Sequence, residues 1–383
     1  MISTRPPVQP LPPVALSIGA ALAMLAASMS GVTNDMVDYL IPWFDHIVAT
    51  GRIAAFAEPF SNYTPPYLYL LSALTLFEGV APTMILIKLL SVAGTVALAL
   101  AVRHLLIRLK APEPDRGAAL VFVMPTVLLN AGLLGQCDAM WAAPCVMALA
   151  AAVERRHVAM LVWCGIALGF KAQAALVAPF FLALLINRRV PFALWPITPA
   201  VFAATMLPAL ALGWPASSLA TIYFNQPETF TALSLNAPNI WAIVQILPLG
   251  LPLGGLATAA AIGATAAYLA YFSARPLDRR TLLSAALLAP LLTAGLLPRM
   301  HECYFFLADV LSLVLALTYR DKKSWTIALL VQAGSLLAMA GYFINHDALA
   351  VIGGIAMIVA TFRLAGPLLK PAANDNPIMA RAF

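Results

Sequence analysis

Carboxylates, aromatic side chains and turn-forming residues lie close together between Thr33 and Leu70, in a chain that is otherwise mostly apolar. Asp35 follows by only three residues the first apolar run, which ends at about Val32. A carboxylate held at a membrane surface beside aromatic side chains indicates chemistry on a substrate that is itself partly in the membrane. The aromatic residues of this stretch, Tyr63 among them, also fit an interfacial belt that anchors a protein in the headgroup layer.

Lys171 and Gln173 form a second group of polar candidates, because they separate two apolar runs in the segment GFKAQAALVAPFF. A lysine at the centre of a bilayer costs roughly 3 kcal/mol, so an ionisable residue in such a setting suggests a functional site by default. Lys171 could bind a lipid phosphate as a point charge. The alternative is a side chain that only snorkels to the membrane surface.

A third cluster consists of Arg299, His301 and Glu302, which lie within four positions at the end of another apolar run. Arginine and histidine are suited to gripping a phosphate and to stabilising a leaving group. These three residues therefore predict a phosphate-binding point. The alternative interpretation is an interfacial charge cluster without chemistry.

Two weaker signals complete the set of candidate residues. Asp138 ends the tight turn GQCD between two apolar runs, where it could meet a substrate or hold a neighbouring loop by hydrogen bonds. Asn236 and Asn239 belong to a loop rich in amides and aromatics, from Trp214 to Ile240. Such side chains are the usual tools for holding sugar hydroxyls, although this signal is only compositional.

Membrane-spanning helices must position these residues. The chain of 383 residues is 62% hydrophobic and 10% charged, whereas ordinary soluble domains are about 25% charged. The apolar runs are continuous, which favours helices over a β-barrel, because backbone groups in lipid must be paired within the chain. We predict an all-α polytopic fold with about 12 spans of roughly 20 residues each. The expected spans are 14–32, 83–102, 117–134, 139–153, 158–170, 172–187, 191–213, 254–273, 281–297, 305–319, 325–343 and 348–365.

The distribution of charge predicts the orientation. Eighteen of the 22 Lys and Arg residues fall in alternate loops that would share one side with both termini, and the positive-inside rule assigns that side to the cytoplasm. The first outer loop, with Asp35, would lie on the opposite side and carry a short interfacial helix from Asp38 to Gly51. We expect one membrane domain over residues 1–365 and a cytoplasmic tail over 366–383. A retained first helix is favoured over a cleaved signal peptide.

Several chemistries lack a sequence signal. The chain has no Walker motif, no HExxH motif and no histidine-rich cluster, and its four cysteines share no metal-ligand spacing. It also lacks basic loops interleaved with aromatic residues, which are typical of nucleic-acid binding. We therefore expect no metal, no cofactor and no nucleic-acid partner.

Five stretches resemble the polytopic glycosyltransferases of the C superfamily (GT-C), which take sugars from polyprenyl-phosphate carriers. The stretches are NDMVDYLIPWFDHI with NYTPPYLYLL, then GQCDAMW, GFKAQAALVAPF, LPRMHECYFFLADVLSL and, more weakly, NAPNIW. Together they span residues 34–313. The chain is most similar to bacterial mannosyltransferase-like members of that superfamily.

The resemblance implies a catalytic mechanism and roles for the candidate residues. Asp35, eight residues before the tryptophan of the Pro-Trp pair, matches the catalytic base of such enzymes, and Asp38 is the rival candidate. Lys171, Arg299 and His301 would meet the carrier phosphate. The family pattern usually continues His-Glu-Arg-Tyr where this chain has HECY, so one cation is missing. The remaining residues expected to contact substrate are Tyr63, Asp138, Gln173, Asn236, Asn239 and Glu302.

The resemblance also implies an inverting transfer of a hexose, such as mannose, to a glycan or glycolipid hydroxyl. The reaction would occur at the periplasmic face of a bacterial inner membrane, with the lipid bilayer as a further partner. The alternative function is a lipid-linked sugar transporter or flippase, because intramembrane charges also mark transport paths. Transporters often consist of two related halves, and the sequence shows no internal repeat.

Overall fold

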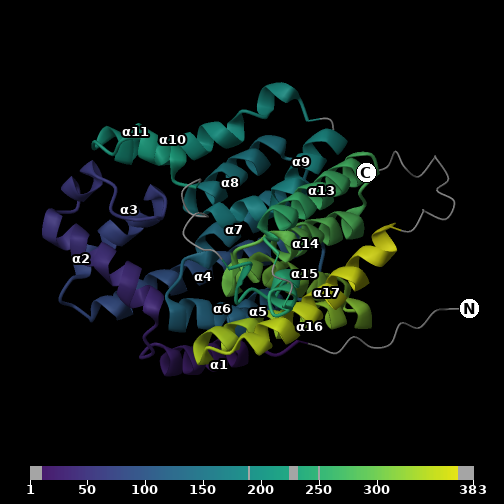
Figure 1. Ribbon diagram of the computed structural model, residues 1–383, viewed down its shortest axis with the longest axis horizontal. Helices are drawn as coiled ribbons and strands as arrows, with labels where there is room; N and C mark the ends of the chain where they lie inside the picture. Colours follow the sequence, from purple (N-terminus) through teal and green to yellow (C-terminus); the bar gives the residue numbers. More distant parts are fainter. Residues whose placement is uncertain (1–10, 189, 224–231, 249–250, 370–383) are drawn as a thin grey trace, which may run out of the picture.

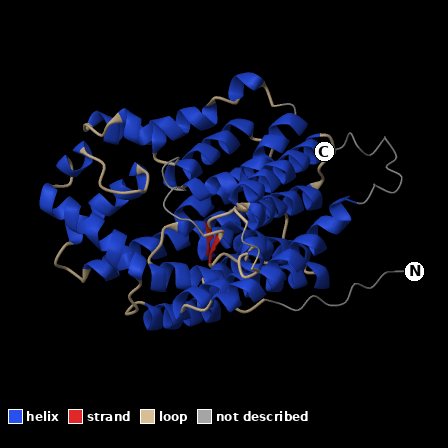
Figure 2. Ribbon diagram, in the orientation of Figure 1, coloured by secondary structure: helices blue, strands red, loops and turns tan. Residues whose placement is uncertain are grey.

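The computed structural model describes residues 11–188, 190–223, 232–248 and 251–369. Most of these residues are helical, as the sequence predicts (Figures 1 and 2). The first half of the chain contains α1 (Val14–Ser28), the π-helix η1 (Met36–Leu40), α2 (Ile41–Thr50), η2 (Ala54–Ala57), α3 (Pro65–Leu74), η3 (Thr75–Phe77), α4 (Thr83–Arg108), α5 (Pro114–Val121), α6 (Pro125–Leu128), the π-helix η4 (Leu129–Leu134), α7 (Asp138–Val153), α8 (His157–Phe170), η5 (Ala172–Val177) and α9 (Ala178–Asn187).

The second half continues with longer helices and two very short strands. Its elements are η6 (Phe192–Leu194), α10 (Ile197–Ala211), α11 (Ala216–Thr221), β1 (Ser234–Leu235), α12 (Ile240–Val244), α13 (Gly254–Ser273), α14 (Arg279–Leu296), β2 (Met300–His301), η8 (Glu302–Phe305), α15 (Phe306–Tyr319), α16 (Lys322–Ile344) and α17 (Asp347–Leu369). The helix α17 continues through 366–369, where the sequence predicts the start of a tail, and residues 370–383 lie outside the described part of the chain.

Every expected apolar run contains helix, but not all of these helices are long enough to cross a bilayer alone. Among the described residues, six helices are sufficiently long and apolar, and a seventh span results if the bent pair 114–121 and 125–134 is counted as one. The shorter apolar helices have 10–17 residues. At 1.5 Å per residue they reach at most about 26 Å, against a hydrocarbon core of about 30 Å. The helices are thus compatible with a membrane protein, and the count of twelve spans stays a prediction.

The helices run between two ends of the molecule. At one end, which we call the basic end, ion pairs join loops that are distant in sequence. Arg108 at the end of α4 pairs with Glu154 after α7 (2.9 Å), and Arg320 after α15 pairs with Glu113 before α5 (2.6 Å). We call the opposite end, where α2 and α3 lie, the site end (Figure 1). Basic loops that the sequence predicts to share one side therefore meet at one end of the structure.

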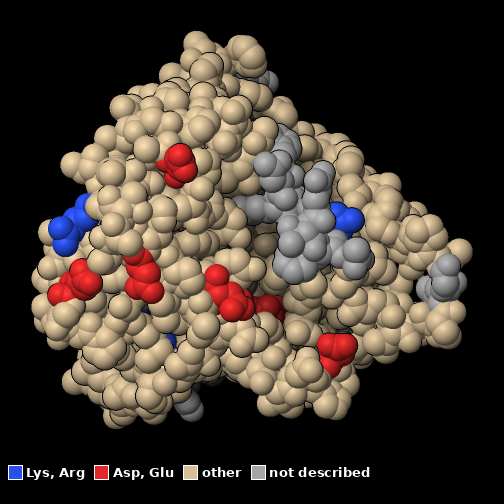
Figure 3. All heavy atoms as spheres, turned by 60° about the vertical axis from the view of Figure 1, so that its left-hand side comes forward, with Lys and Arg blue, Asp and Glu red and all other residues tan. Residues whose placement is uncertain are grey.

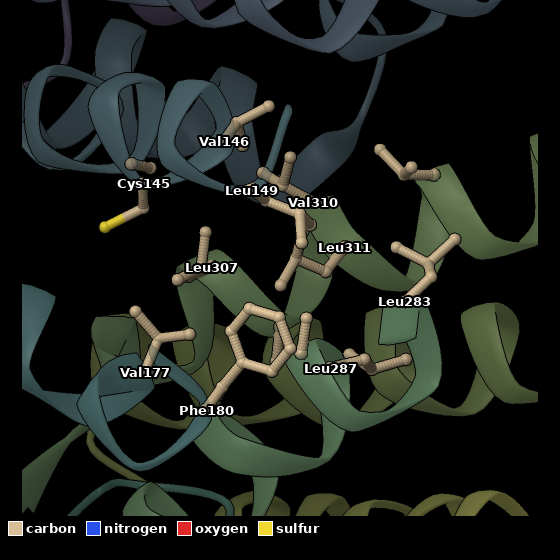
Figure 4. Close-up of a cluster of buried hydrophobic side chains, with 14 of the residues drawn as sticks. Cys145, Val146, Leu149, Val177, Phe180, Leu283, Leu287, Leu307, Val310 and Leu311 are labelled. Atoms are coloured by element: carbon tan, nitrogen blue, oxygen red, sulfur yellow. The ribbon is translucent and has the colours of Figure 1, made fainter. Parts of the chain in front are cut away.

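The main hydrophobic core lies between α7, α9, α14 and α15. Figure 4 shows Leu149 of α7, Phe180 of α9, Leu287 of α14 and Leu311 of α15 directed toward one another, and all four are almost completely buried. Other apolar side chains point outward, including Leu256 on α13, which is 63% exposed. Such an exposed apolar surface fits a hydrocarbon solvent.

The segment between α1 and α4 forms a second hydrophobic cluster, which contains Phe44 and Tyr67. The helix expected from Asp38 to Gly51 is present as η1 and α2. It ends at Gly51, whose φ of 101° is a conformation that favours glycine. The extended turn expected before the next apolar run is also confirmed, because Thr64 is extended and α3 begins at the following proline. Whether this segment lies on a membrane stays a prediction.

A buried lysine connects this segment to the bundle. Lys88 of α4 has no exposed surface, and its ammonium group donates to the backbone carbonyls of Met29 (2.9 Å) and Gly31 (2.5 Å) after the end of α1. A cation at this position binds the unpaired carbonyls of a helix C-terminus and complements the helix dipole. Lys88 therefore fixes the direction in which the chain leaves α1 toward Asp35.

The two short strands are a difference from the all-α prediction. β1 and β2 pair in parallel, with Ser234 opposite Met300 and Leu235 opposite His301 (Figure 2). They bring the amide-rich loop before α12 alongside the ionisable cluster before α15. Two-residue strands carry no periodic pattern, which explains why the sequence does not reveal them.

Candidate functional site

Asp35 precedes η1 at the site end and is partly exposed. Its Oδ2 accepts a hydrogen bond from Nε2 of Gln136 at 2.9 Å, although the two residues are 101 positions apart. The backbone N–H of Gln136 in turn donates to the carbonyl of Asn130 in η4 (3.0 Å). π-Helical turns are rare and occur frequently at functional sites, and one lies on each side of this contact. The Asp35 carboxylate is therefore held in a defined orientation.

Asp138 and Lys171 form a buried ion pair next to this contact. The Lys171 ammonium lies 2.7 Å from Oδ1 of Asp138, and the side chains are 9% and 1% exposed. Asp138 also accepts hydrogen bonds from Nδ2 of Asn130 (2.7 Å) and Nε1 of Trp141 (2.8 Å). Of the two roles that the sequence leaves open for Asp138, this geometry supports the structural one, in which it holds the loop around Lys171.

Aromatic rings cover the ion pair. The Lys171 ammonium lies 5.2 Å from the ring centre of Tyr63, within the range of a cation–π contact. The Tyr63 ring also contacts Trp43 at 5.0 Å and Tyr67 at 5.3 Å between ring centres. The aromatic residues of the first outer segment thus form one wall of the site, which is compatible with some of them also contacting lipid headgroups.

The ionisable cluster at β2 forms a second wall with unusual backbone geometry. Arg299 has a φ of 62° and Asn236 a φ of 58°, which are left-handed conformations uncommon for residues other than glycine. The Arg299 N–H donates to the carbonyl of Leu233 (2.8 Å), and Asn236 forms a bridge with His301. Such conformations cost of order 1–3 kcal/mol and cluster at functional sites. The fold therefore stabilises an unfavourable backbone here.

The two walls are close enough to interact electrostatically. The charges of Asp35, Asp138 and Lys171 all act on the Glu302 carboxyl group, which is 3% exposed. Burial lowers the pKa of His301; the charge of Asp35 opposes this shift and that of Lys171 adds to it. His301 is therefore mainly neutral at pH 7. The structure thus brings together at one end the three clusters that the sequence singled out.

Several buried oxygen atoms around this point lack a hydrogen-bond partner among the described residues. They are Oε1 of Gln136, Oε1 of Gln173, Oε2 of Glu302 and the hydroxyl of Tyr67. His301 Nδ1 approaches the Glu302 oxygen only to 4.0 Å, which is too far for a hydrogen bond. Each buried polar group without a partner costs about 1–3 kcal/mol, and native structures contain few of them. Their concentration here fits a site that forms hydrogen bonds with a ligand.

Two candidate residues, Asn239 and Asp38, have surroundings that differ from those expected of a substrate-binding residue. The Asn239 side chain is 1% exposed and caps α12, accepting from the backbone N–H groups of Trp241 (3.1 Å) and Ala242 (3.0 Å). Its amide nitrogen faces the carbonyls of Ala294 and Leu297 (3.4 Å each). Asn239 is thus engaged in positioning its loop. Asp38, the rival of Asp35, is exposed on η1.

Sequence reasoning missed Gln136 as a site residue. The GQCD turn containing it points to Asp138 alone, because a glutamine in a hairpin turn carries no signal of its own. Its position follows from Gly135, whose φ of 65° suits glycine and whose α-carbon faces the Met36 side chain. Only the contact between this turn and η1 reveals that Gln136 reaches Asp35.

The surface of the site end is more acidic than basic. Figure 3 faces this end and shows Asp and Glu side chains distributed over it, with few Lys and Arg side chains. The acidic residues that the sequence predicts on the outer face include Asp45 and Glu58, both exposed. An incoming anionic group therefore depends on local cations, of which Arg299 is exposed.

Comparisons with known proteins do not assign the chain to a family. No family model matches it, and no curated protein matches its sequence. The resemblance to GT-C enzymes therefore stays a prediction that depends on the five stretches quoted above.

Proposed function

We propose that this protein transfers a hexose from a polyprenyl-phosphate carrier to a hydroxyl of a glycan or glycolipid acceptor, with inversion and with Asp35 as general base. In this proposal the site end faces the periplasm of a bacterial inner membrane, and the basic end faces the cytoplasm in accordance with the positive-inside rule. The chain would cross the bilayer twelve times, with bent and shorter helices surrounded by longer ones.

The observation that carries the proposal is the group of unpaired buried oxygen atoms beside a carboxylate of fixed orientation. Within the described part of the chain, Gln136 presents Oε1 and Glu302 presents Oε2 without a hydrogen-bond partner, and Asp35 is bonded to the same Gln136. The amide oxygens of Gln136 and Gln173 can only accept hydrogen bonds, so they need a ligand that donates them. A sugar ring carries several hydroxyl donors, whereas a phosphate at neutral pH mainly accepts. The arrangement therefore favours a polyhydroxylated substrate at this point.

In the transfer step, the acceptor hydroxyl oxygen forms a bond to the anomeric carbon as the bond from that carbon to the phosphate oxygen breaks. The bonding electron pair leaves with the polyprenyl phosphate, and the hydroxyl proton goes to the Asp35 carboxylate. Attack from the face opposite the phosphate inverts the anomeric configuration. General-base catalysis of this kind typically contributes 10²–10⁴-fold, and positioning of the two substrates contributes much of the remainder.

The leaving phosphate would meet β2. Arg299 supplies an exposed positive charge, and His301 supplies an N–H donor in its neutral form, because burial lowers its pKa. The positive charge of Lys171 is largely compensated by Asp138 at 2.7 Å. We therefore infer that Lys171 acts mainly by holding the Tyr63 wall and the Asp138 loop in place, and contributes less to phosphate binding than the sequence alone suggests.

The experiment is an assay of the purified protein with radiolabelled polyprenyl-phosphate mannose or glucose and a set of glycan and glycolipid acceptors. We expect Asp35→Asn to lower the transfer rate at least about 100-fold while donor binding is retained. Asp38→Asn tests the rival base, and Asp45→Asn serves as the control, since Asp45 is an exposed carboxylate on the adjacent helix.

Each alternative has its own outcome in this assay. Full activity of Asp35→Asn with loss of activity in Asp38→Asn would transfer the role of the base to Asp38. Movement of the labelled donor across vesicles without formation of a product would replace the enzyme by a transporter. If the protein neither forms a product nor transports any carrier-linked sugar, the proposal is refuted.

A further inference from the structure

A cavity of about 200 Å³ lies at the basic end between α14, α16 and α17, at the opposite end of the bundle from Asp35. Small-molecule sites usually measure about 300–1,000 Å³. This cavity is smaller than that range, so it can hold a headgroup or a single functional group and not a whole cofactor. Its lining differs from the apolar surface around it and has a polar and an apolar wall.

The polar wall carries two cations, three hydroxyl groups and one carboxylate. These are Arg280, Lys323, Thr281, Ser284, Ser324 and Asp278. The Arg280 guanidinium is fixed in place, because it lies over the ring of Tyr319 at 4.5 Å from the ring centre. Guanidinium, ammonium and hydroxyl groups together are the donors that bind phosphate oxygens.

The nearby carboxylates cancel part of this charge. Asp278 accepts a hydrogen bond from the backbone N–H of Thr281 (2.7 Å) and caps α14. Asp321 caps α16 through Ser324 (2.7 Å) and pairs with Arg280 (2.5 Å). Asp321 therefore compensates much of the Arg280 charge, whereas Asp278 is directed to a backbone partner.

The charge balance of the two helix starts is positive. The segments 278–281 and 321–324 contain four basic and two acidic residues. A negatively charged group near the cavity is therefore attracted, and at a membrane surface each Lys or Arg contributes about 1 kcal/mol to the binding of anionic lipid.

The apolar wall is formed by α17, which also carries apolar side chains on the outer surface of the bundle. Leu364 and Leu368 of α17 line it. On the other side of the same helix, Phe362 is 74% exposed and Leu369 is 58% exposed. Because α17 carries apolar side chains both in the cavity and on its exposed face, it suits a ligand with a charged head and hydrocarbon chains.

We propose that this cavity binds the phosphate headgroup of an anionic phospholipid from the leaflet at the basic end, with the acyl chains along the exposed face of α17. The lipid would join the starts of α14 and α16 to the end of α17. This site is independent of the sugar-transfer proposal, because none of its residues belongs to the site end.

The test measures thermal unfolding of the full-length protein in detergent during titration with phosphatidylglycerol. Phosphatidylcholine and inorganic phosphate are titrated in parallel. We expect phosphatidylglycerol to raise the unfolding temperature and the other two to have little effect. Lys323→Gln should shift the half-effect concentration of phosphatidylglycerol roughly fivefold upward, which corresponds to the contribution of one basic residue.

Two further variants separate binding from folding. Thr281→Val keeps the backbone cap with Asp278 and removes only the hydroxyl, so it should weaken the phosphatidylglycerol effect without lowering the unfolding temperature of the lipid-free protein. Lys110→Gln is the matched control, since Lys110 is exposed at the same end and does not line the cavity.

Equal stabilisation by phosphatidylcholine, or an unchanged response of both Lys323→Gln and Thr281→Val, would overturn the proposal. Stabilisation by inorganic phosphate as strong as that by phosphatidylglycerol would overturn the lipid assignment, because it would show that the cavity binds free phosphate.

Discussion

The ion pair between Asp138 and Lys171 offers the sharpest test of the site's architecture. In Asp138→Asn the lysine keeps its charge in a nearly waterless environment, because the two side chains are only 1% and 9% exposed. The substitution also places an amide where Asp138 accepts from Asn130 and Trp141. Breaking a buried pair by removal of one partner costs about 3–5 kcal/mol.

This cost sets the expected size of the effect. Solvent hardly screens this buried pair. The free energy of unfolding of Asp138→Asn should therefore fall by about 3–5 kcal/mol, and not by the 0–1 kcal/mol that is typical of exposed pairs. At about 2 °C per kcal/mol for a protein of this size, the unfolding temperature should fall by roughly 6–10 °C. The double variant Asp138→Asn with Lys171→Met has no uncompensated charge and should regain about half of the loss or more.

The assay is thermal unfolding of detergent-purified variants, with Asp45→Asn as the control for removal of an exposed carboxylate on the same end. The four members of the cycle (native, two single variants and the double variant) give the coupling energy of the pair, which for contacting residues amounts to about 0.5–3 kcal/mol. The reasoning is refuted if Asp138→Asn unfolds within a degree or two of the control. It is equally refuted if Lys171→Met makes the Asp138→Asn protein still less stable.

Three further predictions concern other parts of the structure. Gln136→Ala should lower the turnover number about 10- to 100-fold with little change in the KM for the donor, because it releases Asp35 from its orientation; an effect on KM alone would contradict a positioning role. Lys88→Met should destabilise the protein by about 1–3 kcal/mol, because it leaves the carbonyls of Met29 and Gly31 unpaired, and a denaturation midpoint equal to that of the native protein would disprove it. Burial lowers the pKa of His301 below its usual value of about 6.5. The neutral imidazole therefore makes its full contribution to stability above about pH 6.5, and this contribution is lost as the pH falls toward the lowered pKa. The native protein should therefore lose more thermal stability between pH 7.5 and 5.5 than His301→Gln, and equal losses would exclude this group as the cause.

The sequence determined the local structure of this protein. Apolar runs, prolines and glycines gave helices at all expected positions, the end of α2 at Gly51 and the start of α3 after Thr64. These features depend on neighbouring residues, since helix termini are set by capping and by backbone preferences. The composition likewise predicts apolar helices, which are compatible with a membrane protein. The number of spans was less certain, because a run of 14 to 16 apolar residues can cross only part of a bilayer.

Only the tertiary structure decided how the polar residues are used. Lys171 has the same local sequence whether it binds a phosphate, snorkels or pairs with Asp138, 33 residues earlier. The contact between Gln136 and Asp35, the capping role of Asn239 and the neutral form of His301 likewise depend on residues or burial that the neighbouring sequence does not specify. A buried polar side chain takes its role from the partner that the fold places within about 3 Å of it. That partner is chosen by the packing of helices that are distant in the chain.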